Sequence, residues 1–111
     1  MEIQFKIDEK NRGSFFIENG SNTQVAELDF EVKDGILNAY HTGVRKELEG
    51  QGIAAKLFDK MVDYARENEY KVLPTCSYIL VKFKRNENEL SDIWFRDEDE
   101  PTGAACGIKP R

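Results

Sequence analysis

Two glycines next to a predicted helix start are the first residues whose types and spacing could do chemistry. Gly50, Gln51 and Gly52 follow a strand that ends at Val44, and a helical apolar pattern begins at Ile53. The first N–H groups of a helix have no partner within the helix and carry partial positive charge. Glycine accepts a positive φ and has no Cβ to obstruct a ligand. The turn therefore predicts a site for an anion such as a phosphate, although the two glycines equally suit a plain strand-to-helix turn.

A cysteine and a histidine are the candidates for covalent or acid–base chemistry. Cys76 lies where a second helix is predicted to begin, and a helix N-terminus stabilises a thiolate. It can accept an acyl group or donate a proton to a leaving thiolate, but it can also be a small buried residue at a strand end. His41, the one histidine, is expected on the same strand face as Leu37 and Ala39. It is either a core histidine bonded to backbone or an acid–base group that faces a reaction cleft.

Three weaker candidates lie close to these residues. Tyr78 can donate its hydroxyl to a leaving sulfur or can belong to the core. Glu47 and Glu49 lie in the glycine loop, where a carboxylate facing inward would repel phosphate, so both are expected to face solvent or a basic neighbour. Glu47 is therefore a weak candidate for a general base. One histidine and two distant cysteines, Cys76 and Cys106, do not have the spacing of metal ligands, and we expect both thiols to be reduced.

The elements that must position these residues begin with four predicted strands. In residues 25–32 the apolar positions alternate with Glu27, Asp29 and Glu31, which is typical of a half-buried strand. Residues 2–8 show the same period of two, and the other strands are expected at 15–17 and 36–44. Asp34 and Gly35 suit a tight hairpin because both residues tolerate positive φ. Short turns between consecutive strands imply an antiparallel meander.

The pattern changes to that of a helix after Gly52. The residues that recur every four positions are Ile53, Leu57, Met61 and Ala65. This spacing predicts an amphipathic helix of about four turns, followed by a short strand at 70–73 that Pro74 ends. A helix between two strands predicts a right-handed crossover, so the fifth strand should be parallel to the fourth. Thr75 or Ser77 is expected to cap a second helix, and residues 86–95 to form a last turn or helix. The fold class is therefore α/β, of the α+β kind.

Length and charge restrict the remaining possibilities. The chain has 111 residues and a net charge of −5, which fits one domain over residues 1–95 and an acidic, then Gly/Ala/Pro-rich tail over 96–111 that we expect to be mobile. Acidic residues also outnumber basic ones outside the tail, and this argues against nonspecific nucleic-acid binding. There is no apolar run near the length of a membrane span and no signal-peptide pattern. We therefore expect a cytoplasmic protein that does not contact membranes.

One segment resembles a known family. The sequence of residues 44–57, V-R-K-E-L-E-G-Q-G-I-A-A-K-L, is similar to the acyl-CoA-binding motif Q/R-x-x-G-x-G/A of the GNAT acetyltransferase superfamily. Gly52 and Ala54 match the last two fixed positions, whereas Glu49 departs from the first. The flanking H-T-x-V and P-T-C-S-Y segments resemble the small, minimal branch, whose members carry a cysteine after the fifth strand. The resemblance covers about residues 3–95 and lacks the helices that larger members insert after their first strand.

The resemblance implies an acyl-CoA N-acyltransferase-like fold and a coenzyme A site. Backbone amides in the loop would hold the pyrophosphate, namely those of Gly50, Gln51, Gly52, Ile53 and Ala54. The fourth strand from Thr42 to Val44 would bind the pantetheine arm, and the thioester would lie between the fourth and fifth strands beside Cys76 and His41. The implied activity is acetyl transfer from acetyl-CoA to an unknown amine, either a small molecule or a protein. The alternative is a non-catalytic module that binds acyl-CoA or a protein partner.

Overall fold

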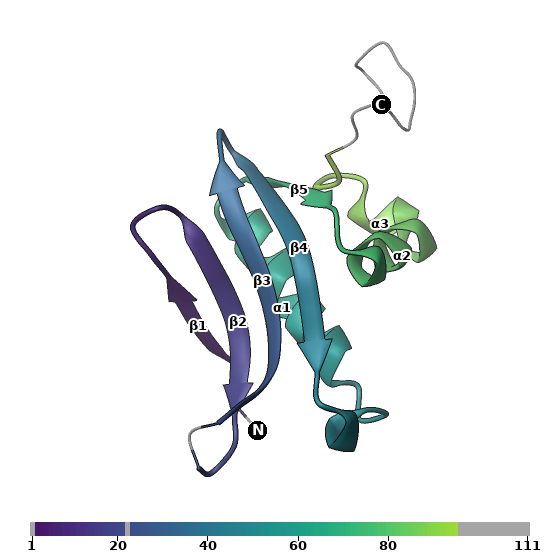
Figure 1. The fold of residues 1–111 in the computed structure, drawn as a ribbon. Helices are drawn as coiled ribbons and strands as arrows, with labels where there is room; N and C mark the ends of the chain where they lie inside the picture. The colour runs from purple at the N-terminus through teal and green to yellow at the C-terminus, as the bar shows by residue number, and fades with distance from the viewer. Residues whose placement is uncertain (1, 22, 96–111) are drawn as a thin grey trace.

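A five-stranded sheet with the strand order β1-β2-β3-β4-β5 forms the centre of the computed structural model, which describes residues 2–21 and 23–95 (Figure 1). The strands are β1 (Gln4–Ile7), β2 (Arg12–Glu18), β3 (Gln24–Lys33), β4 (Ile36–Val44) and β5 (Lys71–Pro74). The other elements are the 3₁₀ helix η1 (Lys46–Leu48) and the helices α1 (Ile53–Glu67), α2 (Ser77–Arg85) and α3 (Glu87–Leu90). The predicted tail and Cys106 lie outside the described residues.

The strand pairing confirms the predicted fold class. β1 to β4 form an antiparallel meander, and β5 pairs in parallel with β4 after the α1 crossover. The β3–β4 hairpin turns at Asp34 and Gly35, which have φ values of 55° and 80°. These are the positive values that a tight hairpin turn requires.

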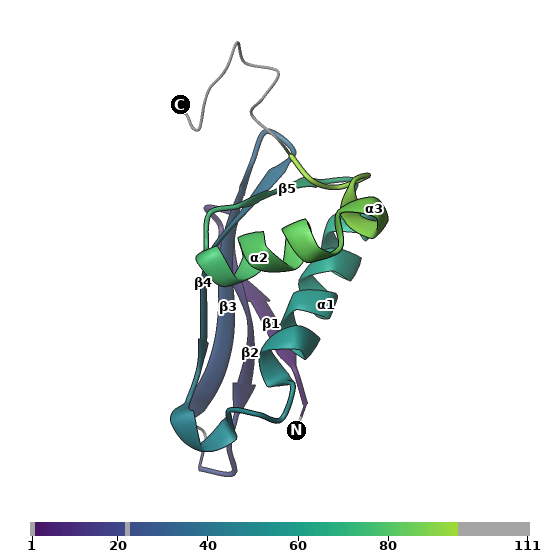
Figure 2. The ribbon, with the colours of Figure 1, turned by 90° about the vertical axis from the view of Figure 1, so that its right-hand side faces the viewer.

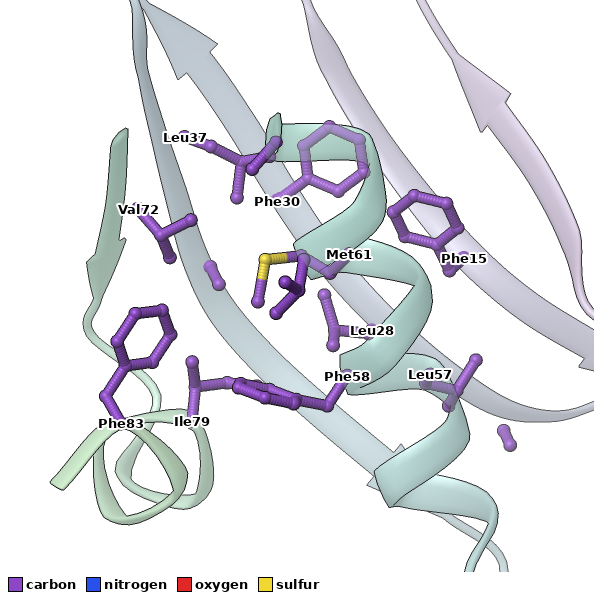
Figure 3. Close-up of a cluster of buried hydrophobic side chains, with 14 of the residues drawn as sticks. Phe15, Leu28, Phe30, Leu37, Leu57, Phe58, Met61, Val72, Ile79 and Phe83 are labelled. Carbon is purple, nitrogen blue, oxygen red and sulfur yellow. The ribbon is translucent and has the colours of Figure 1, made fainter. Parts of the chain in front are cut away.

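One helix supplies most of the side chains that cover the sheet. α1 presents its apolar stripe to the strands, and its buried residues are Ile53, Leu57, Phe58, Met61, Val62 and Ala65. They pack against β-strand residues such as Leu28, Phe30 and Leu37, each with no exposed surface, and against Phe83 of α2 (Figure 3). This burial fixes the position of the α1 N-terminus relative to the end of β4.

The sheet is covered on one face only. Figure 2 shows α1, α2 and α3 on one side of the strands, and no described helix covers the other side. β3 alternates between the two faces, with Leu28 and Phe30 toward the helices and with Glu27, Asp29 and Glu31 on the opposite side. The meander therefore has an open, acidic face.

The prediction that residues 2–8 form a half-buried strand is wrong about burial. All four residues of β1 are exposed, and Phe5 retains 44% of its accessible surface. β1 is an edge strand that lies beyond most of the surface covered by α1. Phe5 does reach the helix, where its ring centroid lies 5.1 Å from that of Tyr64.

A bulge in β4 overturns the predicted placement of His41. Asp29 pairs with His41 while its neighbour Phe30 pairs with Ala39, so Tyr40 is an extra residue in β4. An extra residue shifts the alternation of side chains by one position. His41 therefore lies on the open face with Asp29, whereas Ala39 remains on the helix face. The expectation that His41 shares a face with Ala39 is wrong for this reason.

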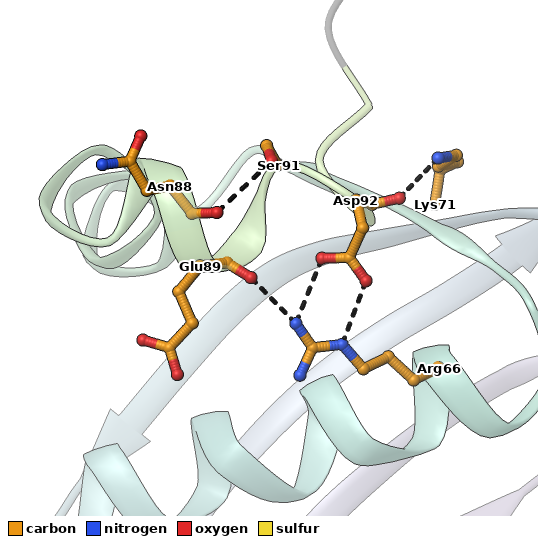
Figure 4. A network of polar contacts seen from close by, with 6 residues as sticks. All are labelled: Arg66, Lys71, Asn88, Glu89, Ser91 and Asp92. Atoms are coloured by element: carbon orange, nitrogen blue, oxygen red, sulfur yellow. Dashed lines mark hydrogen bonds and ion pairs between the residues drawn. The ribbon is translucent and has the colours of Figure 1, made fainter.

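The last described segment is fastened to both α1 and β5. The Arg66 guanidinium donates to the Asp92 carboxylate at 3.1 Å and 3.2 Å and to the Glu89 carbonyl at 3.0 Å (Figure 4). The Val72 N–H donates to the Ile93 carbonyl at 2.6 Å, and a parallel bridge joins Val72 to Trp94. The segment after α3 thus lies along the free edge of β5.

Candidate functional site

The fourth and fifth strands separate in the middle of β4. Their pairing extends from Ile36–Lys71 to Ala39–Pro74. β4 continues to Val44, whereas the chain after Pro74 turns away into α2 (Figure 1). In the described part of the chain, residues 40–44 therefore have no strand partner on the β5 side, and their backbone groups on that edge can bind a ligand.

Cys76 lies at the point where the strands separate. Its N–H donates to the Ala39 carbonyl at 3.0 Å, and the Thr75 hydroxyl donates to the same carbonyl at 3.2 Å. The Cys76 Sγ lies 3.7 Å from Thr42 Oγ1 on β4, and the thiol is free and partly buried. These contacts hold the thiol beside the unpaired stretch of β4. The predicted capping of α2 by Thr75 or Ser77 is wrong, because Cys76 is the N-cap residue and no side chain bonds there.

The loop from η1 to α1 has the backbone that the glycines predict. Gly50 and Gly52 have φ values of 86° and 73°, and a Cβ added to either would meet no described atom within 4 Å. Gly52 is the N-cap of α1 and provides no side-chain bond to the first turn, which also contains no acidic residue. The first N–H groups of α1 thus face open space with partial positive charge.

A cavity of about 240 Å³ lies against this helix end. Its lining comes from the end of β4, the loop, the first turn of α1 and α2, namely Val44, Leu48, Glu49, Gly50, Gly52, Ile53, Ala54, Ala55 and Tyr78. Two of the predicted cofactor-binding residues are not in the lining. Gln51 is exposed beside the cavity, and Thr42 contacts the Cys76 sulfur instead. The cavity thus joins the glycine loop to α2, the helix that Cys76 begins.

Tyr78 is the titratable group on the α2 side of the cavity. Burial raises the pKa of its phenol above 10.0, and the charges of Asp59 and Cys76 raise it further. The hydroxyl is therefore protonated at neutral pH and can donate a hydrogen bond or a proton. The sequence left open whether Tyr78 belongs to the core or to a site. In the structure its partly buried ring packs against the core, and the residue also lines the cavity.

The acidic residues of the loop largely follow expectation. Glu47 lies 3.6 Å from the Arg45 guanidinium, so it faces a basic neighbour, which is one of the two expected surroundings. Glu49 is exposed, as predicted, but it also contributes to the lining of the cavity. A carboxylate at that place weakens the attraction of the helix end for an anion.

His41 and Cys76 are not brought together. The His41 Nε2 lies 2.9 Å from the Glu27 carboxylate on the open face of the sheet. Cys76 contacts Thr42, which pairs with Leu28 and therefore points to the helix face. The two candidate catalytic side chains thus lie on opposite faces of β4.

Thr75 and Asn38 are site residues that sequence reasoning missed in this role. The Thr75 hydroxyl donates to Asn38 Oδ1 as well as to the Ala39 carbonyl, and so ties the start of α2 to β4. The position of Thr75 next to Cys76 in the sequence was a signal that Thr75 could belong to the same site. Its partner on β4 is 37 residues away in sequence and becomes visible only through the strand pairing.

Residues 2–21 and 23–95, which the structure describes, also bear on metal binding and on membrane spans. No three His, Cys, Asp or Glu side chains in these residues are arranged to hold a metal ion. No helix among them is long and apolar enough to cross a membrane.

Comparison with known proteins identifies the family. Residues 14–93 match the model of the GCN5-related N-acetyltransferases, so this chain belongs to that family. The solution structure of a GCN5-like putative N-acetyltransferase from Staphylococcus aureus is 32% identical, with a TM-score of 0.62, over 90% of this chain and 93% of that one. This agreement places the chain with the small single-domain members, as the resemblance implied.

Larger acetyltransferases share the fold at low sequence identity. Tetrahymena GCN5 is 12% identical with a TM-score of 0.55, over 69% of this chain and 51% of that one. A putative acetyltransferase from Agrobacterium tumefaciens is 22% identical with a TM-score of 0.54, over 76% and 60%. Comparison with curated protein sequences gives no match. The chain thus has the shared fold at a smaller size.

Proposed function

We propose that this protein is an acetyl-CoA-dependent N-acetyltransferase of minimal size. The observation that carries the proposal is the cavity where the uncapped N-terminus of α1, the two positive-φ glycines and Tyr78 meet. It lies at the end of the β4 stretch that has no β5 partner in the described chain. An anion site at one end and an unpaired strand edge leading from it suit a ligand with a phosphate group and a long amide-containing arm.

Coenzyme A fits these residues. Its pyrophosphate would accept hydrogen bonds from the backbone N–H groups between Gly50 and Ala54, with Gln51 at the rim. Its pantetheine amides would bond to the backbone of β4 from Thr42 to Val44. The thioester would then lie where β4 and β5 separate, beside Cys76. When bound, acetyl-CoA supplies an activated acetyl group.

The chemistry requires the movement of two protons. The acceptor nitrogen forms a bond to the acetyl carbon and loses a proton to a base, while the carbon–sulfur bond breaks and the thiolate takes up a proton. Tyr78 has a protonated hydroxyl in the cavity, and Cys76 has its thiol at the strand opening. In this proposal either group would protonate the sulfur, and Cys76 could alternatively accept the acetyl group itself. His41, which lies beside Glu27, would take a proton from an amine that approaches on the open face.

A matched pair of glycine variants tests the coenzyme site. Gly52→Leu places a side chain in the path of the phosphate, whereas Gly35→Leu makes the same change in the β3–β4 hairpin. Both glycines have positive φ, 73° and 80°, with open space around the added Cβ. Both variants should therefore lose about 1–2 kcal/mol of unfolding free energy from backbone strain. Only Gly52→Leu should lose coenzyme A affinity in calorimetry.

The control separates loss of binding from loss of folding. If Gly35→Leu binds coenzyme A as the wild type does and Gly52→Leu does not, the loop is the binding site. If the Gly52→Leu protein is folded and has unchanged affinity, the proposed site is wrong.

A binding module without turnover is the second candidate. The observation in its favour is that His41 and Cys76 lie on opposite faces of β4, so the thiol has no histidine base beside it. Steady-state release of coenzyme A from acetyl-CoA in the presence of amines distinguishes the two candidates. Tight binding with no release above the uncatalysed rate would favour the module.

A further inference from the structure

A second cavity lies on the open face of the sheet, away from the helices. It has a volume of about 390 Å³, and its lining includes Lys6, Ser14, Asp29 and Tyr40. Tyr40 is the bulge residue of β4 and follows directly after Ala39. The Ala39 carbonyl accepts the hydrogen bond from the Cys76 N–H. Through Tyr40 the cavity reaches β4 next to Ala39, the last residue of β4 that pairs with β5.

The charged groups that line this cavity are two cations, Lys6 and Arg12, and two anions, Asp8 and Asp29. The Lys6 ammonium lies 4.9 Å from the centroid of the Phe16 ring, and Arg12 is paired with Asp8 at 3.7 Å. Asp29 forms no hydrogen bond or ion pair with another described side chain in the cavity, and Glu31 follows it on the same face of β3. A carboxylate without an ion-pair partner can bind a positively charged group of a ligand.

Ser14 independently indicates that this cavity can bind a polar ligand. The residue is only 4% exposed, and the described contact of its hydroxyl is 3.5 Å to the carbonyl of its neighbour Phe15. Hydroxyl hydrogen bonds are ordinarily about 2.5–3.0 Å long. A buried hydroxyl without a good partner costs free energy, which a hydrogen-bonding ligand in the cavity would recover.

Tyr40 completes the polar lining. Its side chain is 45% exposed, so its hydroxyl and ring can be reached from solvent. Burial raises the pKa of the phenol, and the Asp29 and Glu31 carboxylates raise it further. The hydroxyl therefore stays neutral and can accept a hydrogen bond from an ammonium group, while the ring offers its negative face.

We infer that this cavity binds the second positive charge of an acceptor that carries more than one amine. One ammonium group of the acceptor pairs with Asp29 and bonds to Ser14 and Tyr40. Another amine of the same molecule extends past the bulge to the opening between β4 and β5, where it loses its proton and takes the acetyl group. This inference rests on the proposed acetyltransferase function and specifies the class of its acceptor, an alkylamine with at least two cationic groups.

The test compares acceptors and a matched pair of variants. Spermidine carries three amines, butylamine carries one, and a short peptide with two lysines presents the same alkylammonium groups on a polypeptide. Asp29→Asn removes the carboxylate of the cavity, and Glu67→Gln removes one from the last turn of α1 on the helix side of the sheet. Initial rates give kcat/KM for each acceptor, calorimetry gives coenzyme A affinity, and NMR titration with spermidine maps the contact residues without turnover.

The wild type should prefer spermidine to butylamine. Asp29→Asn should lower kcat/KM for spermidine about fivefold, as expected for the loss of one partly exposed ion pair, and Glu67→Gln should not. Spermidine should shift the amide resonances of Ser14, Asp29 and Tyr40. If the two-lysine peptide, and not spermidine, is the preferred acceptor and shows the same loss in Asp29→Asn, the source of the amine is a polypeptide.

Two results would overturn the inference. One is equal kcat/KM for mono- and polyamines, unaffected by Asp29→Asn, in a protein that binds coenzyme A. The other is spermidine-induced shifts that avoid Ser14, Asp29 and Tyr40. A protein that binds spermidine at these residues but shows no affinity for coenzyme A would instead refute the proposed function.

Discussion

At the scale of single residues, the geometry around Cys76 ranks the candidate roles. Its N–H is bonded to Ala39 and its sulfur lies 3.7 Å from the Thr42 hydroxyl. The thiol is thus held at the strand opening but has no histidine beside it, because His41 points to the other face. A proton donor needs only to lie near the leaving thiolate, whereas a covalent nucleophile also needs a base beside it.

Replacing Cys76 separates these roles. Cys76→Ser keeps a small polar group next to Thr42 but removes the thiol. If Cys76 carries the acetyl group, mass spectrometry after incubation with acetyl-CoA should show an adduct on the Cys76 peptide of the wild type and none in the variant. If it donates a proton, turnover should fall about 100-fold with no adduct in either protein. Unchanged turnover would exclude Cys76 from the mechanism.

At the scale of elements, one ion pair joins the last described segment to α1. The Arg66 hydrogen bonds to Asp92 lower the pKa of that carboxyl below its ordinary value of 3.8. A group whose pKa is lower in the folded state stabilises the fold above its unfolded pKa, and this contribution is lost as the pH falls through the folded pKa. The contribution of the pair is therefore present at neutral pH and is lost in acid.

The variant Asp92→Asn should show this pH dependence directly. Since both side chains are about half exposed, the variant should lose at most about 1 kcal/mol of unfolding free energy at pH 7. The difference from wild type should begin to shrink as the pH approaches the ordinary carboxyl pKa of 3.8, and it should close only as the pH falls through the lowered pKa of the folded state. Urea unfolding at several pH values measures this, with Glu67→Gln as the control. A difference that persists in acid would assign the loss to something other than the charge.

At the scale of the whole molecule, the fold depends on a single layer of helices. One layer on one face means that α1 supplies much of the core, and the open face retains carboxylates that a covering helix would have buried (Figure 2). The same arrangement keeps the cavity at the α1 N-terminus and the open-face cavity on opposite sides of the sheet.

A truncation in the middle of α1 should therefore destabilise the whole protein. Met61 has no exposed surface, and Met61→Ala should cost about 2–5 kcal/mol of unfolding free energy because it leaves a cavity under the sheet. Val81 is 43% exposed on α2, and Val81→Ala should change the free energy by no more than about 0.5 kcal/mol. Denaturant unfolding of both variants checks this. Similar losses in the two would contradict a core centred on α1.

Local patterns in the sequence were enough for much of the fold. The alternation in residues 25–32 gave β3, the four-residue recurrence from Ile53 gave α1, and the hairpin at Asp34 and Gly35 has the predicted positive φ. Each of these depends on neighbouring residues only, through side-chain periodicity or the absence of a Cβ. The glycine loop was predictable for the same reason.

The amino-acid sequence by itself determined the strands, the crossover helix and an open helix N-terminus at Gly52. The tertiary structure alone decided which face His41 takes, because the extra residue at Tyr40 appears only when β4 is paired with β3. It also decided that Cys76 meets Thr42, 34 residues away, and that Ser14, Asp29 and Tyr40 enclose one cavity. The physical reason is that local sterics fix the conformation of a segment, whereas the register between distant strands fixes which side chains come together.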